Sequence, residues 1–325
     1  MNNEILYYNE HYTEFEPQCP IVIPSYKHRD NTILNNLKSL SNNKIMLFIY
    51  DTDYELYKEH EDEQVEIVQI PEQWRSIQRK RHWIQTYLAN NRPEIENYFM
   101  IDDDIKKAKV TCYKDSGSVT SKYIPIMNAL GILEHLHKKY SNTVSGGASN
   151  SMGILNDKKL YNNTQPMYQL FLFNNKLMRD NPQCMFRDMQ NVSEDNLIWY
   201  DLYNNNITYY SFSCLYFEFD NQRNKKYNSI ASTSMNIKRN NINALRIMKN
   251  NCKLTWSSEW NCWGVRLTKS YETIYPNVKE ILDKNMPNWE DLTVDYSDKV
   301  FNEVFEEIDK LLNKGNDTEI NDFLI

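Results

Sequence analysis

The sequence predicts an α/β fold, with a mostly parallel sheet flanked by helices and a helical extension toward the C-terminus. Within the first 105 residues, four apolar runs rich in β-branched and aromatic residues alternate with segments of helical periodicity. Strands that alternate with helices are joined by right-handed crossovers, which give a parallel sheet covered on both faces. Near the end of the chain, residues 300–312 place apolar side chains at helical spacing.

The predicted elements of the first half follow the order β-α-β-α-β-α-β. Strands are expected at residues 19–24, 44–50, 65–70 and 98–101, and helices at 30–40, 53–60 and 74–88. In the second half we expect a loop or hairpin at 106–117, helices at 125–140 and 193–202, and a strand at 168–174. His135 and His137 lie two residues apart on a helix, so they make a poor metal pair and are expected at the surface.

The chain has 325 residues and a mass of 38.9 kDa, which is enough for one large domain or for a domain with an appendage. We expect a main domain over residues 1–235, with halves at 1–105 and 106–235, and a basic, aromatic and helical region over 236–325. The formal net charge of −7 argues against general nucleic-acid binding, although a local basic face is compatible with that average.

Several common classes of site are missing from the sequence. It contains no GxGxxG after the first strand and no GxxxxGK[ST], so neither dinucleotide redox chemistry nor P-loop phosphoryl transfer is supported. The six cysteines form no CxxC pair, which favours reduced thiols. Because there is no signal pattern and no run of about 18 apolar residues, we expect a soluble cytoplasmic protein with no membrane partner. No obligate protein partner is inferred.

Three consecutive carboxylates follow the fourth predicted strand. Asp102, Asp103 and Asp104 need counter-charge if they are buried, so the strand is expected to stop at a solvent-filled edge. In extended chain Asp102 and Asp104 point to one side, and Asp103 points to the other. Two carboxylates on one side suit Mg²⁺ or Mn²⁺. The alternative is an acidic turn that caps a following helix.

Other polar residues are expected at the same edge, because ligands of a parallel sheet bind outside the carboxyl ends of its strands. They are Ser25, Tyr26 and Arg29 after the first strand, Asp51 after the second, and Arg79 and Arg81 on the helix after the third. A ring, a carboxylate, cations and a metal-binding pair are the set that a nucleoside diphosphate requires. Each residue has an alternative reading. Tyr26 packs on the sheet, the arginines form a solvated helix face, or Asp51 caps a helix.

Three segments carry a resemblance to a known family. They are Ile21-Val-Ile-Pro-Ser-Tyr26, Arg81-His-Trp-Ile84 and Phe99-Met-Ile-Asp-Asp-Asp104. In this order and spacing they resemble the nucleotide-sugar half of a GT-A glycosyltransferase with its DXD motif, which implies a Rossmann-like sheet of GT-A type. The long, family-unlike second half is similar in style to the TET-associated glycosyltransferases of phages, which sugar-modify hydroxymethylated DNA bases.

The resemblance also implies roles for individual residues. Pro24, Tyr26 and Asp51 surround a uracil, Arg81 approaches the base or the pyrophosphate, and Asp102 and Asp104 hold Mn²⁺ or Mg²⁺. From their place at the sheet edge rather than from the resemblance, Ser25, Arg29 and Arg79 are also expected in the nucleotide-sugar site. Asp103, which faces away from the metal pair, is expected to brace the loop or touch the sugar. Several GT-A families add a late histidine to the metal, yet none follows His137 here. Either the aspartates, the pyrophosphate and water suffice, or a carboxylate such as Glu218 or Asp220 completes the ligand set.

The second half adds two candidate features. Gly146 and Gly147 stand side by side in a chain with only seven glycines, which indicates either a close backbone approach to the donor or a hairpin turn. Glu194 and Asp195 open a predicted helix, where acidic residues also occur for reasons of the helix dipole alone. By resemblance to the ED motif of inverting GT-A enzymes, one of the two is the catalytic base. Asp195 is preferred.

A basic concentration follows, at Arg239, Arg246, Lys249 and Lys253. It indicates a phosphate-binding strip for a DNA acceptor, or a solvated surface.

The sequence therefore predicts a metal-dependent, inverting glycosyltransferase with a UDP-sugar donor and a hydroxymethylated base in phage DNA as the favoured acceptor. The rivals are a surface glycan as acceptor, a nucleotidyltransferase, and a non-catalytic nucleotide-binding or DNA-binding module. For a phage protein the location is the host cytoplasm.

Overall fold

The computed structural model describes residues 2–26, 32–38, 43–113, 118–148, 160–162, 170–188, 194–219, 252–257, 262–267, 275–289 and 296–314. The chain divides into two compact units, Met1–Arg223 and Asn224–Ile325. Each unit is described by itself. The domain boundary expected at residue 235 lies outside the described residues.

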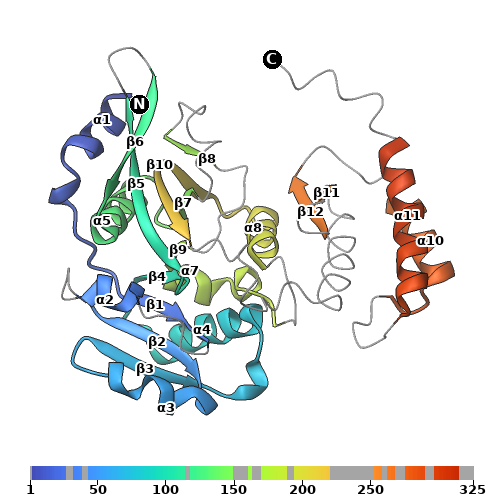
Figure 1. Cartoon of the computed structure of the whole chain (residues 1–325), viewed down its shortest axis with the longest axis horizontal. Coiled ribbons are helices and arrows are strands. Elements are labelled where there is room, and N and C mark those ends of the chain that lie inside the picture. Colours follow the sequence, from blue (N-terminus) through green and yellow to red (C-terminus); the bar gives the residue numbers. More distant parts are fainter. Residues whose placement is uncertain are drawn as a thin grey trace. The chain divides into compact units, whose positions relative to one another are not determined.

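The first unit is built on one large sheet with the strand order β3-β2-β1-β4-β9-β7-β10-β5-β6, and β8 pairs with β10 (Figure 1). The strands are β1 (Ile21–Pro24), β2 (Ile45–Tyr50), β3 (Val65–Ile70), β4 (Asn97–Ile101), β5 (Ile105–Tyr113), β6 (Val119–Ile124), β7 (Val144–Ala148), β8 (Tyr161–Asn162), β9 (Leu170–Asn174) and β10 (Tyr209–Phe219). Strands β1 to β4, β6, β7 and β10 run in one direction, and β5, β8 and β9 run against them. The predicted α/β class and the parallel first half are confirmed.

Helices lie along the connections between these strands. The α-helices are α1 (Asn2–Glu10), α2 (Thr32–Lys38), α3 (Tyr54–Tyr57), α4 (Ile77–Asn91), α5 (Ile126–Leu136), α7 (Asn175–Asp180) and α8 (Glu194–Asn204). Short 3-10 turns are η1 (Tyr12–Glu14), η2 (Asp51–Asp53), η3 (Lys58–His60), η4 (Glu72–Trp74) and η6 (Pro182–Cys184), and η5 (His137–Ser141) is a π-helical turn. The loop or hairpin expected at 106–117 is the β5–β6 hairpin, whose strands begin earlier and end later.

Alternate residues of the parallel strands contribute to two separate cores, because helices cover both faces of the sheet. Ile21 and Ile23 of β1 belong to the core shared with α1, α2 and α5. On the other face, the Phe48 ring of β2 meets Trp83 and Tyr87 of α4, with ring centroids 6.2 and 5.8 Å apart. Along each of these strands, odd-numbered and even-numbered residues therefore point to opposite faces of the sheet.

The amino end of β1 is fixed to α5. The buried carboxylate of Glu134 accepts hydrogen bonds from the backbone N–H groups of Gln18 and Cys19, at 2.7 and 3.0 Å. Gly131 lies one turn earlier, where a Cβ atom would stand only 2.6 Å from the carbonyl carbon of Phe15. The absence of a side chain at Gly131 thus allows the chain to cross α5 closely before it enters the sheet.

His137 is buried, so the expectation that it lies at the surface is wrong. Its Nδ1 lies 2.9 Å from Ser145 Oγ, and its Nε2 lies 3.3 Å from Asn97 Oδ1. His137 is four residues after Leu133, so it continues the apolar face of α5. Burial lowers the pKa of His137 to about 4. His135 is exposed, as expected.

The described part of the second unit consists of a hairpin and a pair of helices. Strand β11 (Cys252–Ser257) pairs antiparallel with β12 (Cys262–Leu267). Helices α10 (Tyr275–Asn285) and α11 (Asp298–Lys314) contact each other, and α11 confirms the helix expected at 300–312. None of the helices in the described parts of the chain is both long and apolar enough to cross a membrane.

Candidate functional site

The acidic triplet forms a tight turn at the carboxyl edge of the sheet. Strand β4 ends at Ile101 and β5 begins at Ile105, so Asp102, Asp103 and Asp104 connect them, each partly buried. The next element is a strand, so the alternative of a helix cap is wrong. The extended conformation assumed for the triplet is also wrong, because the chain reverses direction within these three residues.

One arginine holds two aspartates at this edge. The Arg81 Nη2 atom of α4 donates to Asp102 Oδ1 at 2.6 Å, and its Nη1 atom donates to Asp195 Oδ1 at 2.7 Å. Asp195 is the second residue of α8 and lies 114 residues after Arg81 in the chain. The predicted metal-binding aspartate and the predicted base are therefore brought together by a shared guanidinium, which we call the Arg81 bridge.

The environment of Arg81 differs from the expected solvated helix face. Its side chain is only 1% exposed, while those of Asp102 and Asp195 are 19% and 16% exposed. The guanidinium carbon lies 5.7 Å from the ring centroid of Phe171 and 5.2 Å from that of Phe186. Arg81 is thus a buried ion-pair partner in this structure. Its predicted approach to the base or the pyrophosphate stays a prediction.

Asp103 braces the end of β1 instead of joining this bridge. The Ser25 hydroxyl donates to Asp103 Oδ2 at 2.7 Å and lies 2.9 Å from the hydroxyl of Tyr57. Tyr57 belongs to the core shared with α2 and α5, whereas Asp102 meets α4 on the opposite side. Asp102 and Asp103 therefore point to opposite faces of the sheet.

A buried lysine lies under the loop after β1, and the sequence analysis did not select it. Lys80 donates through Nζ to the carbonyl oxygen of Ser25, and its Nζ lies 4.0 Å from the ring centroid of Tyr50. Burial lowers the pKa of Lys80 to about 7, although the carboxylates of Asp103 and Asp53 act in the other direction. Lys80 thus binds the carbonyl group of Ser25, while Asp103 accepts from its hydroxyl group.

Aromatic side chains line the edge beside this lysine. The rings of Tyr26 and Tyr50 meet edge to face with centroids 5.9 Å apart, and the Arg75 guanidinium lies 5.9 Å from the Tyr26 ring. The Tyr50 hydroxyl accepts from the backbone N–H of Ser76 at 3.2 Å. Tyr26 is partly exposed, so it packs on the sheet and also presents a surface to solvent.

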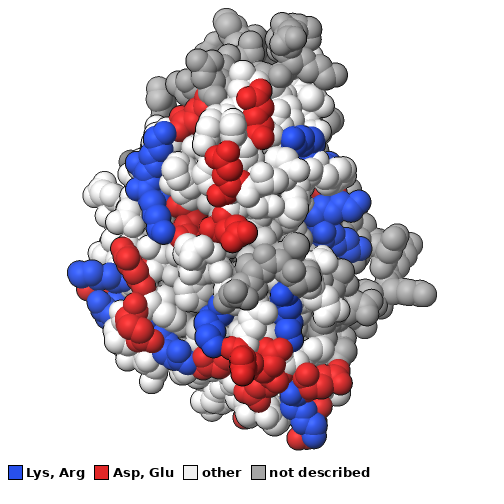
Figure 2. All heavy atoms as spheres, turned by 90° about the vertical axis from the view of Figure 1, so that its left-hand side faces the viewer, with Lys and Arg blue, Asp and Glu red and all other residues white. Residues whose placement is uncertain are grey.

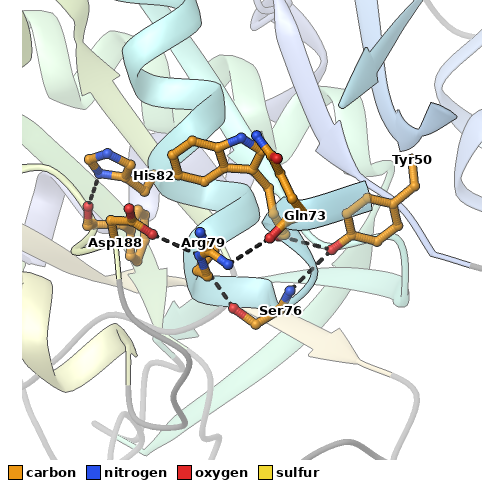
Figure 3. A network of polar contacts seen from close by, with 8 residues as sticks. Tyr50, Gln73, Ser76, Arg79, His82 and Asp188 are labelled. Atoms are coloured by element: carbon orange, nitrogen blue, oxygen red, sulfur yellow. Dashed lines mark hydrogen bonds and ion pairs between the residues drawn. The ribbon is translucent and has the colours of Figure 1, made fainter. Parts of the chain in front are cut away.

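Arg79 takes part in a network that fastens the segment after η6 to α4 (Figure 3). Its Nε donates to Asp188 at 2.7 Å and its Nη1 donates to the carbonyl of Gln73 at 2.6 Å. Three and six residues further along α4, His82 Nδ1 lies 2.6 Å from the carbonyl oxygen of Phe186, and the Gln85 side chain accepts from the backbone N–H of the same residue at 2.7 Å. Arg79 is therefore already paired in a structural contact.

The side chain of Gln78 is entirely buried, yet its amide has no hydrogen-bond partner among the described residues. Neither its amide nitrogen nor its amide oxygen finds a hydrogen-bond partner among the described residues. It lies three residues before Arg81, on the same face of α4 and nearer to the carboxyl edge. A buried amide without partners destabilises a fold, so such a group calls for an explanation. The sequence analysis missed Gln78, although the spacing of Gln78, Arg81 and Gln85 marks one helix face.

The remaining predicted residues of the first unit lie at or near the same edge. Pro24 is the buried last residue of β1, and exposed Asp51 follows β2, where its Oδ1 accepts from the backbone N–H of Thr52 at 2.8 Å. Gly146 and Gly147 lie within β7, so the hairpin-turn alternative is wrong. A Cβ atom on Gly147 would stand 2.4 Å from the Phe217 ring, so the close approach expected there is made by a side chain of the protein itself.

Several predicted residues fall outside what the structure describes. They are Arg29, Arg239, Arg246 and Lys249, together with the side chains of Glu194 and Lys253. On the face of the molecule shown in Figure 2, Lys and Arg side chains are interspersed with Asp and Glu side chains. This mixture agrees with the net charge of −7 and means that a nucleic-acid interface on this face has to be local.

The acidic turn offers carboxylate oxygens, the type of ligand that hard divalent cations such as Mg²⁺ prefer. In the described parts of the chain, no three His, Cys, Asp or Glu side chains cluster as a ligand set. Glu218, one of the residues considered as a third ligand, is instead paired with Lys109 and Tyr123. If a metal binds here, Asp102 and Asp104 would supply oxygen ligands to which a substrate phosphate and water would be added, the arrangement that Mg²⁺ favours. The Arg81 bridge engages Oδ1 of Asp102, and a carboxylate has a second oxygen for a metal.

Comparisons with known proteins give likenesses among solved structures but none at the level of sequence. No protein-family model matches the chain, and no curated protein sequence matches it. Among solved structures, the chain is similar to a crystal structure of GalNAc-T7 with UDP, GalNAc and Mn²⁺, with 9% sequence identity and a TM-score of 0.41. The match covers 93% of this chain and 55% of that chain, so the protein spans about half the length of this neighbour. A likeness at this level does not assign an activity.

Proposed function

We propose that the protein is a metal-dependent, inverting glycosyltransferase that moves a sugar from a UDP-sugar to a hydroxyl group. The observation that carries the proposal is the Arg81 bridge, which holds Asp102 after β4 and Asp195 of α8 at one guanidinium. Group transfer requires the leaving group and the base to lie close together on a fixed frame. The bridge brings a carboxylate suited to each task to the same place.

The proposed donor site is the carboxyl edge around the acidic turn. Asp102 and Asp104 hold Mn²⁺ or Mg²⁺, which when bound offsets charge on the diphosphate leaving group. Tyr26, Asp51 and Pro24 accommodate the uracil. Ser25 and Asp103 fix the loop that borders it, through their 2.7 Å hydrogen bond. Arg29 and Arg79 are the proposed phosphate ligands, for which Arg79 has to leave Asp188.

The proposed base is Asp195, with Glu194 as the neighbouring alternative. In an inverting transfer, the acceptor oxygen attacks the anomeric carbon while the bond to the diphosphate breaks, and the base takes the hydroxyl proton. Arg81 orients Asp195 for this step. We assign Arg81 to positioning, because the guanidinium is buried and faces two carboxylates rather than solvent.

The acceptor that we favour is a hydroxymethylated base in phage DNA. The support comes from the resemblance of the first half to GT-A enzymes and from the basic residues Arg239, Arg246, Lys249 and Lys253. Of these, the structure describes only the backbone of Lys253. A surface glycan is the rival acceptor, and reversing the charges of Arg246 and Lys249 without loss of transfer would favour it.

A thermal-shift panel of nucleotide sugars, with and without Mn²⁺, tests the proposal. A ligand present at about 100 times its dissociation constant adds about 2.7 kcal/mol to the free energy of unfolding, which is readily measured. We expect a UDP-sugar to stabilise the protein and Mn²⁺ to strengthen the effect. If no UDP-linked ligand stabilises it, the proposal is wrong. Release of UDP rather than pyrophosphate on turnover distinguishes the enzyme from a nucleotidyltransferase.

A matched pair of variants tests the base. Asp195→Asn keeps the size of the side chain and removes its ability to accept a proton, so turnover should fall by about 100-fold or more while donor stabilisation persists. Asp188→Asn is the control, because Asp188 also pairs with an arginine of α4 but lies in the structural network of Figure 3. Equal turnover in the two variants would contradict the assignment of Asp195.

A further inference from the structure

An exposed tyrosine stands among lysines on the antiparallel side of the sheet. Tyr123 of β6 is 55% exposed, one of the few large side chains with apolar surface that the described residues leave open to solvent. The Nζ atoms of Lys107 and Lys109 on β5 lie 5.0 and 4.5 Å from its ring centroid. On the next strand, Glu218 of β10 pairs with Lys109 and accepts from the Tyr123 hydroxyl at 3.1 Å. These four residues form what we call the Tyr123 platform.

The platform lies on the same face of the sheet as the Arg81 bridge. Leu215 and Phe217 of β10 belong to the core shared with α5, so Glu218 points to the other face. That other face is the one on which Asp102 meets Arg81 of α4. Strand β5 also starts directly after the acidic turn. A ligand lying across β10, β5 and β6 on this face would therefore reach toward Asp102.

A bulge next to the platform adds a further exposed cation. Lys107 pairs with Glu218, whereas Ile105 pairs with Phe219, so Lys106 is an extra residue in β5. Bulges of this kind redirect side chains and often occur beside functional sites. Lys106, Lys107 and Tyr123 also line a hollow of about 360 Å³ at the edge of the sheet. Its other side is formed by Asn36 of α2 and by residues 124–126 at the start of α5. The platform thus combines an exposed ring, a concave border and a local excess of positive charge.

Protection of a sheet edge does not account for all of these features. Strand β6 is the last strand in the sheet order, and lysines on edge strands discourage pairing with other chains. Lys106 and Lys107, however, belong to β5, which is paired on both sides. An exposed aromatic ring does not serve such protection.

We propose that the Tyr123 platform is the acceptor-binding surface and that it takes a single-stranded or unstacked segment of nucleic acid. Tyr123 stacks on a base, and Lys106 and Lys107 contact phosphates. Exposed rings and cations on antiparallel strands are the general means of binding single strands, because every base has a face for stacking. This inference rests on the proposed transferase function for its role as acceptor site, while the binding itself needs no donor.

Fluorescence anisotropy of a labelled single-stranded oligonucleotide of about 12 nucleotides tests the platform. Tyr123→Ala should weaken binding roughly 5- to 100-fold, the range observed when a stacking ring is removed. The double variant Lys106→Ala with Lys107→Ala should reduce the slope of log affinity against log salt by about 1.4, since each phosphate contact on a single strand contributes about 0.7.

Matched variants separate stacking from other effects. Tyr123→Phe keeps the ring and loses the hydroxyl with its contacts to Glu218 and Lys109, so it should bind almost as well as the unchanged protein. Tyr203→Ala removes a ring that is 56% exposed on α8 and should have no effect. Equal losses in Tyr123→Phe and Tyr123→Ala would overturn the stacking role.

Binding partners and donor stabilisation give separate answers. Tight binding of a sulfated oligosaccharide, with no binding of the oligonucleotide, would replace nucleic acid by an acidic glycan and overturn the proposal. If a UDP-sugar stabilises the protein but the oligonucleotide does not bind, the proposal for the Tyr123 platform is wrong and the proposed function stands. If the oligonucleotide binds through Tyr123 but no UDP-sugar stabilises the protein, the proposed function is wrong and the platform remains a nucleic-acid surface.

Discussion

At the amino edge of the sheet Glu134 and His137 are buried and matched with partners, whereas at the carboxyl edge charges are concentrated and the buried amide of Gln78 has no partner among the described residues. Glu134 accepts from two backbone N–H groups, and His137 is neutral between Ser145 and Asn97. At the opposite edge, Arg81 faces two carboxylates and the amide of Gln78 has no partner among the described residues. Matched groups stabilise a fold, while a buried group without a partner calls for an explanation, such as a bound water, an ion or a ligand.

The largest expected effect comes from removing Arg81. Arg81→Met leaves two partly buried carboxylates without their shared cation, and breaking a buried ion pair from one side costs about 3 to 5 kcal/mol. We expect urea unfolding to show a loss in that range and donor stabilisation to disappear. Arg79→Met is the control for the free energy of unfolding alone, because its partner Asp188 is 46% exposed and such pairs contribute at most about 1 kcal/mol. Similar losses in both variants would remove the distinction between the bridge and the surface network.

The second prediction concerns pH and the amino edge. The pKa of His137 is lowered to about 4 by burial, with Lys138 acting in the same direction and Glu134 against it. The unfolded chain binds this proton at a pKa of about 6.5, so His137 contributes to stability above that pH. The contribution of about 3 kcal/mol is lost as the pH falls from about 6.5 to about 4.

The measurement is the free energy of unfolding as a function of pH in two proteins. His137→Asn cannot take up the proton, so its stability should fall less steeply than that of the unchanged protein between pH 6.5 and pH 4. Parallel curves would show that His137 does not titrate as its burial indicates.

The smallest effect on stability, and the sharpest on function, is expected at Gln78. Gln78→Leu removes a buried amide that has no partner, so the free energy of unfolding should stay the same or rise. Stabilisation by a UDP-sugar should weaken if the amide meets a donor group. Gln85→Leu is the matched control on the same helix face, because it orphans the Phe186 N–H and should cost about 1 to 3 kcal/mol. A comparable loss in Gln78→Leu would mean that its amide already has a structural partner.

The order of strands and helices in the first half could be predicted because alternation of apolar runs and helical periodicity is a local signal. The burial of Arg81 could not be predicted by treating its neighbourhood as a run of charges. Its pairing depends on Asp195, more than a hundred residues away in sequence. The position of His137 could have been predicted, because it continues the spacing of the apolar face of α5.

The contacts of the acidic turn could not be predicted without the tertiary structure. Sequence alternation placed Asp103 opposite Asp102, but the partners Ser25 and Tyr57 come from two other segments that the sheet brings together. The Tyr123 platform was missed for a similar reason. A single tyrosine among 23 is uninformative until the pairing of β5, β6 and β10 shows which lysines surround it.

The Arg81 bridge also sets an order for assembly during synthesis. Arg81 and Asp102 leave the ribosome together, but Asp195 follows 114 residues after Arg81, at a translation rate of about 5 to 20 residues per second. For several seconds the nascent sheet carries an arginine with only one of its two carboxylates. A chain that stops before α8 would keep the acidic turn without the helix that completes it. Completion of the Arg81 bridge is therefore tied to synthesis of nearly the whole first unit.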